Sequence, residues 1–304
     1  MIRKPAALPP GGTIGIVNPS SPVEENLMAA GITALEARGF RIVIAPHVRD
    51  KYGHRAGTDA NRAADFTQFY ADPLIDVVWC ARGGSSSLRL WSLIDWKLLS
   101  QFPPKMVIGY SDTTSLLIPL NQIVETICLH GPLIFELGTK LPSHLLDWQL
   151  SLLQNTLSLG EVPGHAADTL LPGKASGKLC GGCLSLITAT LGTPYQIDTH
   201  EKLLLVEDID EAPHRVERML AHLASTGLLE SAAGFIVGEA TGADDSRTLP
   251  IRHIWAEALM PFGKPTVLGF PFGHVSENYA LPLGVEAELN ADAGTLNLLG
   301  AAVI

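Results

Sequence analysis

The sequence lacks any run of basic residues. Its 304 residues include 21 Lys and Arg against 31 Asp and Glu, which gives a formal net charge of −10 at pH 7. A protein that binds a phosphate backbone needs concentrated Lys and Arg. We therefore expect no nucleic-acid partner.

Long apolar runs are also absent, and none approaches the ~20 residues of a membrane-spanning helix. Residues 1–5 carry two positive charges. A Pro- and Gly-rich turn at residues 8–12 then replaces the apolar segment and cleavage site of a signal peptide. These absences predict a cytoplasmic protein with no membrane partner.

Cysteine is scarce, with four residues at positions 80, 128, 180 and 183, too few for a disulfide scaffold in a chain of this length. Cys180 and Cys183 have the CxxC spacing of a redox or zinc site, but a structural zinc site needs a second pair of ligands. His214 and Glu217 have HxxE spacing, which is a weak metal signal on its own. We expect small buried cysteines, and neither a metal nor a cofactor.

The remaining composition, 46% apolar and 17% charged, is typical of a globular protein with a sizeable core. In the first half, strand-like segments alternate with segments whose apolar residues recur at helical spacing. The expected strands cover residues 13–17, 41–44, 75–80, 106–109 and 126–129, and the expected helices cover residues 23–38, 58–70, 88–99 and 144–157, with another through residue 120. This alternation predicts an α/β fold whose N-terminal parallel sheet is covered on both faces, as in flavodoxin- or amidotransferase-like domains.

The second half has fewer helical patterns and short strands such as 203–206 and 234–237. Residues 284–304 alternate apolar and polar side chains around Gly294, which indicates antiparallel pairing. We therefore divide the chain into an N-terminal α/β domain over residues 1–158, a Gly- and Pro-rich linker over 159–176, and a smaller, mixed β-rich domain over 177–304.

A tight turn, Gly-Tyr-Ser-Asp-Thr at residues 109–113, follows the fourth expected strand. A strand-to-helix turn with a small residue before the serine exposes the hydroxyl, which makes Ser111 a candidate nucleophile. Thr113 stands where the GxSxG elbow has glycine, so the turn differs from that of α/β-hydrolases. The alternative is that Ser111 or Asp112 caps the following helix.

Two turns could supply the backbone N–H groups of an oxyanion hole. The N–H of Asp112 follows the candidate nucleophile at a helix N-terminus. Arg82-Gly83-Gly84 ends the neighbouring strand, where glycine lets a backbone N–H approach a substrate carbonyl. Functional residues gather at the carboxyl ends of parallel strands, so we expect the two turns to lie together. An ordinary glycine-rich turn is the alternative.

Several residues compete for the roles of base and acid. His274 lies in a loop rich in Gly and Pro, whereas His130 follows the fifth expected strand, and spacing alone leaves both open. Glu207 and Asp208 end an apolar strand, where a partly buried carboxylate could hold an imidazole.

Six motifs follow one another along the chain: residues 8–21 (LPPGGTIGIVNPSS), 81–84 (ARGG), 109–113 (GYSDT), 129–132 (LHGP), 206–208 (VED) and 273–274 (GH). In this order they resemble the LD-carboxypeptidase family of serine peptidases, over nearly the whole chain. The resemblance implies a triad of Ser111 as nucleophile, His274 as base and Glu207 as acid, in a cleft between two domains. It also implies oxyanion donors at the N–H groups of Asp112 and Gly84.

The family includes murein tetrapeptide carboxypeptidases and microcin-immunity peptidases. The resemblance implies metal-free hydrolysis of the bond that joins an L-centre to a C-terminal D-amino acid. The expected substrate is a murein tetrapeptide that loses its terminal D-alanine during cell-wall recycling. One alternative is a microcin-immunity-type peptidase that cleaves the acyl link of an aminoacyl-nucleotide or peptidyl-nucleotide analogue. A different class of alternative is a non-catalytic two-domain protein that binds a small ligand.

Other expectations concern assembly, substrate binding and departures from the family pattern. Family members are commonly homodimers, and no cofactor is implied. Arg82 is a candidate anchor for a substrate carboxylate, because its planar fork pairs with one in a bidentate manner, and a structural salt bridge is the alternative. The sequence departs from the family pattern at Cys183, where asparagine is typical, and at residues 85–87, three serines where a Tyr-Gly pair is frequent. These departures bear on substrate preference.

Overall fold

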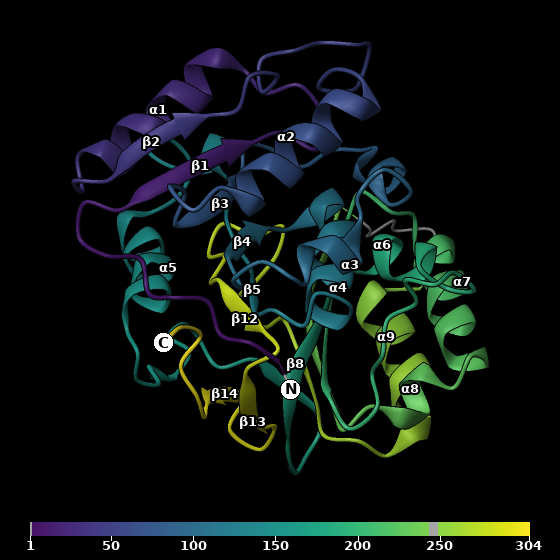
Figure 1. Cartoon of the computed structure of the whole chain (residues 1–304). Helices are drawn as coiled ribbons and strands as arrows, with labels where there is room; N and C mark the ends of the chain where they lie inside the picture. Colours follow the sequence, from purple (N-terminus) through teal and green to yellow (C-terminus); the bar gives the residue numbers. More distant parts are fainter. Residues whose placement is uncertain (1, 243–248) are drawn as a thin grey trace.

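The computed structural model describes residues 2–242 and 249–304. This part of the chain forms two β-sheets with helices packed around them (Figure 1). The purple and blue N-terminal segments build most of the first sheet in the upper part of Figure 1, and the green helices of the second half lie beside its lower right.

The first sheet has the strand order β12-β5-β4-β3-β1-β2. The strands from the N-terminal half are mutually parallel, and β12 closes the edge by pairing antiparallel with β5. The strands are β1 (Thr13–Val17), β2 (Arg41–Ile44), β3 (Val77–Cys80), β4 (Met106–Gly109), β5 (Cys128–His130) and β12 (Leu281–Leu283).

The central strands of this sheet are buried because helices connect them and cover the sheet. Every residue of β1, β3 and β4 is buried, which explains why their sequences are almost continuously apolar. The connecting elements are α1 (Glu25–Glu36), α2 (Asp59–Ala71), η1 (Ser87–Leu90), α3 (Trp96–Leu99), η2 (Ser111–Thr113), α4 (Thr114–Gln122), η3 (Ile134–Glu136) and α5 (Ser143–Gln154).

The second sheet has the order β6-β14-β13-β8-β9-β10-β11-β7. Its middle, from β8 to β11, is parallel, and the outer strands join through antiparallel pairings. The strands are β6 (Gly160–Glu161), β7 (Asp168–Leu171), β8 (Lys174–Cys183), β9 (Leu203–Ile209), β10 (Gly234–Thr241), β11 (Thr266–Leu268), β13 (Glu286–Asn290) and β14 (Thr295–Leu298). The helical elements of this half are α6 (Leu184–Ala189), α7 (Pro213–Ser225), α8 (Leu228–Ser231), α9 (Ile251–Leu259) and η4 (Met260–Phe262).

The predicted fold class is confirmed, with a parallel N-terminal sheet and a second, mixed sheet. The expected antiparallel pairing around Gly294 is the pair of strands β13 and β14. The domain boundaries stay a prediction.

Three segments differ from the expectation. The helix expected over residues 88–99 is broken into η1 and α3, because Asp95 accepts a hydrogen bond from the N–H of Leu98 and so begins a new helix. The segment 159–176, expected to be a linker, contributes β6, β7 and the start of β8 to the second sheet. Strand β12, from the C-terminal half, belongs to the first sheet.

Two hydrophobic clusters lie in the described part of the chain. The larger one runs without interruption from the first sheet to one face of the second, where it includes Leu203, Leu205 and Ile236. The smaller one lies between the other face of the second sheet and the helices α6 to α9. The two halves therefore share a core. No helix in the described ranges combines the length and the apolarity that crossing a membrane requires.

Candidate active site

Ser111 stands directly after β4 in a strained backbone conformation. Its φ is +60°, in the left-handed region that non-glycine residues rarely adopt. The turn is tight because Gly109 has no side chain: a Cβ there would collide with Oγ1 of Thr113, which donates a hydrogen bond of 2.8 Å to the carbonyl of Tyr110. The turn therefore presents the Ser111 side chain at the carboxyl end of the strand, as in a nucleophile elbow.

The Ser111 hydroxyl contacts an imidazole and does not cap a helix. Neither η2 nor α4 has a side-chain cap hydrogen bond, so the helix-cap interpretation is wrong. Instead, Oγ of Ser111 lies 2.9 Å from Nε2 of His274. On the far side of the ring, Nδ1 of His274 lies 2.6 Å from Oε2 of Glu207. With the ring proton donated from Nδ1 to Glu207, Nε2 is the free acceptor for the serine proton.

Glu207 holds the imidazole through two contacts. Its side chain on β9 is fully buried, and the same oxygen that contacts Nδ1 also accepts the backbone N–H of His274 at 3.2 Å. Burial lowers the pKa of an imidazole, but the hydrogen bond and charge of Glu207 outweigh it, so the pKa of His274 lies above its ordinary value. Glu207 thus stabilises the protonated ring that would form when His274 accepts a proton.

The loop that carries His274 depends on a glycine. Gly273 has a φ of +87°, and a Cβ at this position would lie 2.5 Å from Oε2 of Glu207. Its N–H donates to Oδ1 of Asn278 at 2.9 Å, which fixes the turn from the other side. Only a residue without a side chain lets this loop close on the carboxylate.

Asp112 ties the loops around Ser111 together. Its Oδ2 accepts hydrogen bonds from the Ser20 hydroxyl at 2.6 Å and from the N–H of Ser87 at 2.9 Å. The Ser87 hydroxyl donates to the Asp112 carbonyl at 2.7 Å. Because Ser20 follows β1 and Ser87 follows β3, one carboxylate connects the carboxyl ends of three neighbouring strands.

The turn of residues 82–84 lies beside Ser111, as expected from the strand order. A Cβ on Gly83 would lie 3.0 Å from Cβ of Ser111, so the backbone passes very close to the serine. Gly84, with a φ of +117°, packs against Ser21, whose hydroxyl accepts the N–H of Ser85 at 3.1 Å. The glycines therefore allow two loops and the serine turn to approach one another.

Arg82, the first residue of this turn, is half-buried. Its guanidinium donates to the carbonyl of Pro22 at 2.8 Å and lies 5.8 Å from the ring centroid of Phe135. Arg82 forms no ion pair with any described residue, so the structural salt bridge considered as an alternative is not present there. The other N–H groups of the Arg82 guanidinium are available to a ligand.

His130, the competing histidine, is fully buried and does not hydrogen-bond to Ser111. Its ring lies edge-on to Tyr110 and Phe272, and neither nitrogen has a hydrogen-bond partner in the described chain. Burial lowers the pKa of His130 to about 4, so the ring is neutral at pH 7. It forms part of the packing beneath the site.

The remaining candidates lie elsewhere. Asp208, beside Glu207 in sequence, accepts the N–H groups of Ser185 and Ile209, each at 2.8 Å. His214 and Glu217 are exposed on α7. The cysteines are free and buried, and the described residues contain no group of three His, Cys, Asp or Glu side chains that could hold a metal ion.

The sequence reasoning missed two residues beside the imidazole. The Tyr110 ring packs against His274, with centroids 4.9 Å apart, and its hydroxyl donates to Oε1 of Glu136 at 2.7 Å. Burial raises the pKa of Glu136, whose other oxygen accepts the N–H of Leu133 at 2.8 Å. Tyr110 adjoins Ser111 in sequence and could have been noticed, but Glu136 lies in a stretch with no motif.

Family models match both halves of the chain. The model described as the LD-carboxypeptidase N-terminal domain matches residues 14–131, and that of the LD-carboxypeptidase C-terminal domain matches residues 176–289. The chain belongs to the LD-carboxypeptidase family. LD-carboxypeptidases are hydrolases. A Bacillus subtilis relative named "Probable murein peptide carboxypeptidase" is 33% identical over 293 residues, which cover 94% of this chain and 91% of that one.

Two solved structures show the same fold as this LD-carboxypeptidase. A muramoyltetrapeptide carboxypeptidase from Oxalobacter formigenes is 27% identical, with a TM-score of 0.81 over 94% of this chain and 97% of that one. MccF in complex with glutamyl sulfamoyl guanosine has a TM-score of 0.90 over 99% of both chains at 22% identity, which is a likeness of fold alone.

Proposed function

We propose that this protein is a serine carboxypeptidase that removes the terminal D-alanine from murein tetrapeptides, with Ser111, His274 and Glu207 as its triad. The observation that carries the proposal is the continuous relay of 2.9 Å from Ser111 to His274 and 2.6 Å from His274 to Glu207. Family membership supports the same class of reaction.

In this mechanism His274 Nε2 takes the proton of Ser111 as Oγ attacks the carbonyl between the L-centre and the D-amino acid. The N–H groups of Asp112 and Gly84 donate to the oxyanion, and the clamp of Asp112 on the neighbouring loops holds these donors in place before substrate binds. His274 then gives its proton to the leaving amine. Water, activated by the same imidazole, hydrolyses the acyl-enzyme.

Acidic side chains lie beside the His274 loop. A hollow of about 540 Å3 adjoins this loop, and among the described residues its lining includes the carboxylates of Glu239 and Glu277, the second of which lies 3.8 Å from Nδ1 of His165. These carboxylates would attract the ammonium group of a peptide and repel a phosphate. Arg82 uses one guanidinium N–H for the carbonyl of Pro22, and we propose that its other N–H groups bind a substrate carboxylate.

The second candidate is a peptidase of the microcin-immunity type, because an Escherichia coli relative named microcin C7 self-immunity protein is 24% identical over 96% of this chain. Such a substrate carries a nucleotide-like group beside the scissile bond.

Mass spectrometry of products tests the proposal directly. The wild-type protein is incubated with a murein tetrapeptide and, separately, with an aminoacyl-sulfamoyl nucleotide. We expect loss of D-alanine from the tetrapeptide, and a decrease of at least ~10³-fold in the rate for Ser111→Ala. A Ser92→Ala variant, which removes an exposed hydroxyl elsewhere, should keep the full rate.

Two results would contradict the proposal in different ways. Full activity of Ser111→Ala would exclude the triad. Cleavage of the nucleotide analogue alone would retain the triad and replace the substrate. Failure of a fluorophosphonate to label Ser111 in wild-type protein that does cleave the tetrapeptide would contradict a serine mechanism. Failure of labelling together with no cleavage of either substrate would favour the non-catalytic ligand-binding alternative.

The proposal extends to a homodimer that acts in the cytoplasm, as the family resemblance implies. Light scattering on the purified protein tests the first point, and a mass of one chain (32.4 kDa) would contradict it. Fractionation of the cells that produce the protein tests the second.

A further inference from the structure

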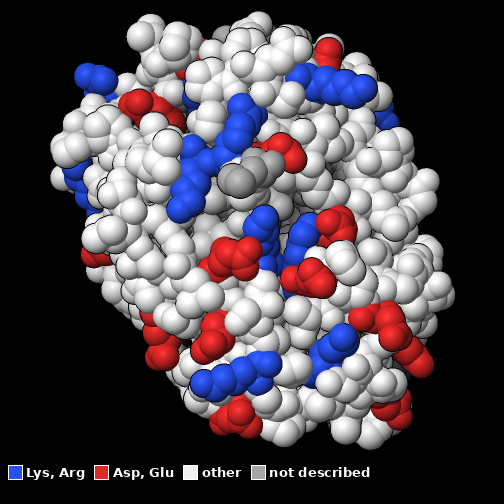
Figure 2. All heavy atoms as spheres, turned by 60° about the horizontal axis from the view of Figure 1, so that its bottom comes forward, with Lys and Arg blue, Asp and Glu red and all other residues white. Residues whose placement is uncertain are grey.

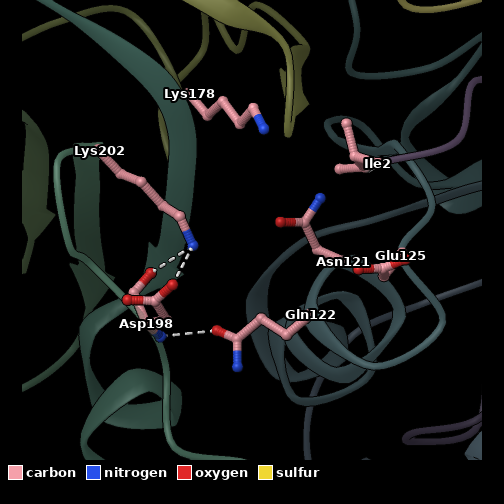
Figure 3. A pocket seen from close by; sticks show the side chains of 7 residues that line it. All are labelled: Ile2, Asn121, Gln122, Glu125, Lys178, Asp198 and Lys202. Atoms are coloured by element: carbon pink, nitrogen blue, oxygen red, sulfur yellow. Dashed lines mark hydrogen bonds and ion pairs between the residues drawn. The ribbon is translucent and has the colours of Figure 1, made fainter.

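A cavity of about 390 Å3 lies between the two halves of the molecule (Figure 3), and Ser111 is not among its lining residues. It is lined by Ile2, Asn121, Gln122, Glu125, Lys178, Asp198 and Lys202. The first four belong to the N-terminal half and the last three to the second sheet and the loop before β9. A ligand here would contact both halves.

The cavity lies at the far end of two elements that build the active site. Helix α4 begins just after Ser111 and ends at Gln122, about 13 Å away at 1.5 Å per residue. Lys202 directly precedes β9, and Glu207 lies roughly 16 Å farther along that strand at about 3.3 Å per residue. The cavity is therefore a separate site, connected to the triad by one helix and one strand.

Lys178 supplies an ammonium group that has no partner among the described residues. Its side chain on β8 is half-buried, and in the described chain it forms neither a hydrogen bond nor an ion pair. Lys202, in contrast, donates to the carbonyl of Asp198 at 3.0 Å and to its Oδ2 at 2.7 Å. Since a partly buried charge is costly without a partner, Lys178 provides a place for a carboxylate.

The opposite wall supplies an acceptor. Nδ2 of Asn121 donates to the carbonyls of Leu283 at 3.1 Å and Thr126 at 3.3 Å, which orients Oδ1 into the cavity toward the side of the lysines (Figure 3). Gln122 bridges the two halves, with Nε2 donating to the Gln196 carbonyl at 2.9 Å and Oε1 accepting the N–H of Asp198 at 2.7 Å. The floor of the cavity is thus fixed before a ligand enters.

The lining contains two basic and two acidic side chains, Lys178 and Lys202 with Glu125 and Asp198, and of these Lys202 and Asp198 already pair with each other. Basic and acidic side chains also alternate over the face that Figure 2 turns forward, with neither sign dominating. A balanced lining disfavours a polyanion and complements a ligand that carries both charges.

We propose that this cavity binds a free α-amino acid, with its carboxylate on Lys178 and its ammonium group toward Oδ1 of Asn121 and the carboxylate of Asp198. The ligand joins residues of both halves and stabilises the folded chain. The proposal does not require the peptidase activity, because it concerns binding at residues outside the triad.

Isothermal titration calorimetry with D-alanine tests the proposal. Propionate, which has only the carboxylate, ethylamine, which has only the ammonium group, and inorganic phosphate are the comparison ligands. We expect D-alanine to bind more tightly than any of the three. Lys178→Met should weaken D-alanine binding at least ~10-fold, because it removes a charge-assisted hydrogen bond. Lys174→Met, on the exposed part of the same strand, should leave the affinity unchanged.

Circular dichroism and thermal unfolding show whether Lys178→Met folds, and Lys178→Arg, which keeps the charge, should retain part of the affinity. Equal binding to wild type and a folded Lys178→Met would overturn the proposal, since any amino acid would then bind elsewhere, including at the triad. If propionate binds as tightly as D-alanine, the ammonium group contributes nothing and the proposal of a zwitterionic ligand is wrong. If phosphate binds tightly, the cavity is an anion site instead.

Discussion

At the scale of single residues, backbone conformation and side-chain volume are most restricted where side chains of the two halves meet. Ser111 adopts a left-handed backbone conformation, Gly273 has no room for a methyl group, and Glu207 is buried with Oε2 on the imidazole. These positions bring the Ser111 hydroxyl, the His274 imidazole and the Glu207 carboxylate within hydrogen-bond distance at the cost of local strain. Substitution of any of them should affect function more than stability.

Replacement of Glu207 by glutamine tests the electrostatic part of the site. The charge of Glu207 raises the pKa of His274, and a base must be neutral to act, so activity rises as pH passes through that pKa. In Glu207→Gln the acidic limb of the kcat/KM profile should move to lower pH, and the plateau should fall by about 10⁴-fold. Glu201→Gln, which removes an exposed carboxylate, serves as the control. An unshifted acidic limb would show that another group titrates there.

Replacement of Gly273 by alanine tests the close steric fit between the His274 loop and the Glu207 carboxylate. The new methyl group would press on the Glu207 carboxylate, so kcat should fall at least ~10²-fold as the imidazole moves from its position. Gly192→Ala is the matched control, because its φ is +72° and no atom lies within 4 Å of the new Cβ. That control should lose about 1 kcal/mol of stability and no activity. Equal activity of both variants would show that the His274 loop tolerates displacement.

At the scale of elements, helix α2 forms ion pairs and hydrogen bonds that support the loops around the site. Asp59, in its first turn, pairs with Arg62 at 2.6 Å and with Arg89 at 2.6 Å. Arg62 is buried and donates to the carbonyls of Pro19 and Ser86, in the same two loops that Asp112 connects. One helix therefore supports the turns on which the proposed oxyanion hole depends.

Asp59 should contribute to stability above about pH 4 and not in strong acid. Hydrogen bonds from Arg89 and Arg62 lower its pKa from 3.8 to about 2. The stabilisation is therefore complete above pH 3.8 and is lost as pH falls through 2. Asp59→Asn should cost about 1–2 kcal/mol at pH 7, after allowance for solvent screening, and the difference from wild type should disappear near pH 2. Urea unfolding at both pH values measures it, with Asp147→Asn, in an exposed pair, as the control. A difference that persists in acid would contradict the charge explanation.

Elements with strong local patterns could be predicted, and those held by distant contacts could not. The five parallel strands, α2 and α5 are where apolar spacing and turn residues place them. By contrast, β12 contains a proline and becomes a strand because it pairs with β5, a contact that no local pattern records. The sequence predicts the triad of Ser111, His274 and Glu207 only through the resemblance of its ordered motifs to a known family, because the three residues lie far apart in the chain. Glu136 was missed because its partner Tyr110 is brought near only by folding.

At the scale of the whole molecule, the shared hydrophobic cluster joins the two sheets into one thermodynamic unit. We expect a single calorimetric transition, with calorimetric and van't Hoff enthalpies in a ratio near 1. A second transition, or a ratio well above 1, would show that the halves unfold separately.

The antiparallel edge formed by β12 also has a consequence for synthesis on the ribosome. The parallel strands emerge first, but the strand that covers the edge of β5 follows roughly 150 residues later, or about 8–30 s at ~5–20 residues per second. During that interval the nascent chain carries an open β-edge that another nascent chain could pair with. Chaperone demand in the cell should therefore depend on how fast the part of the message that encodes residues 131–280 is translated.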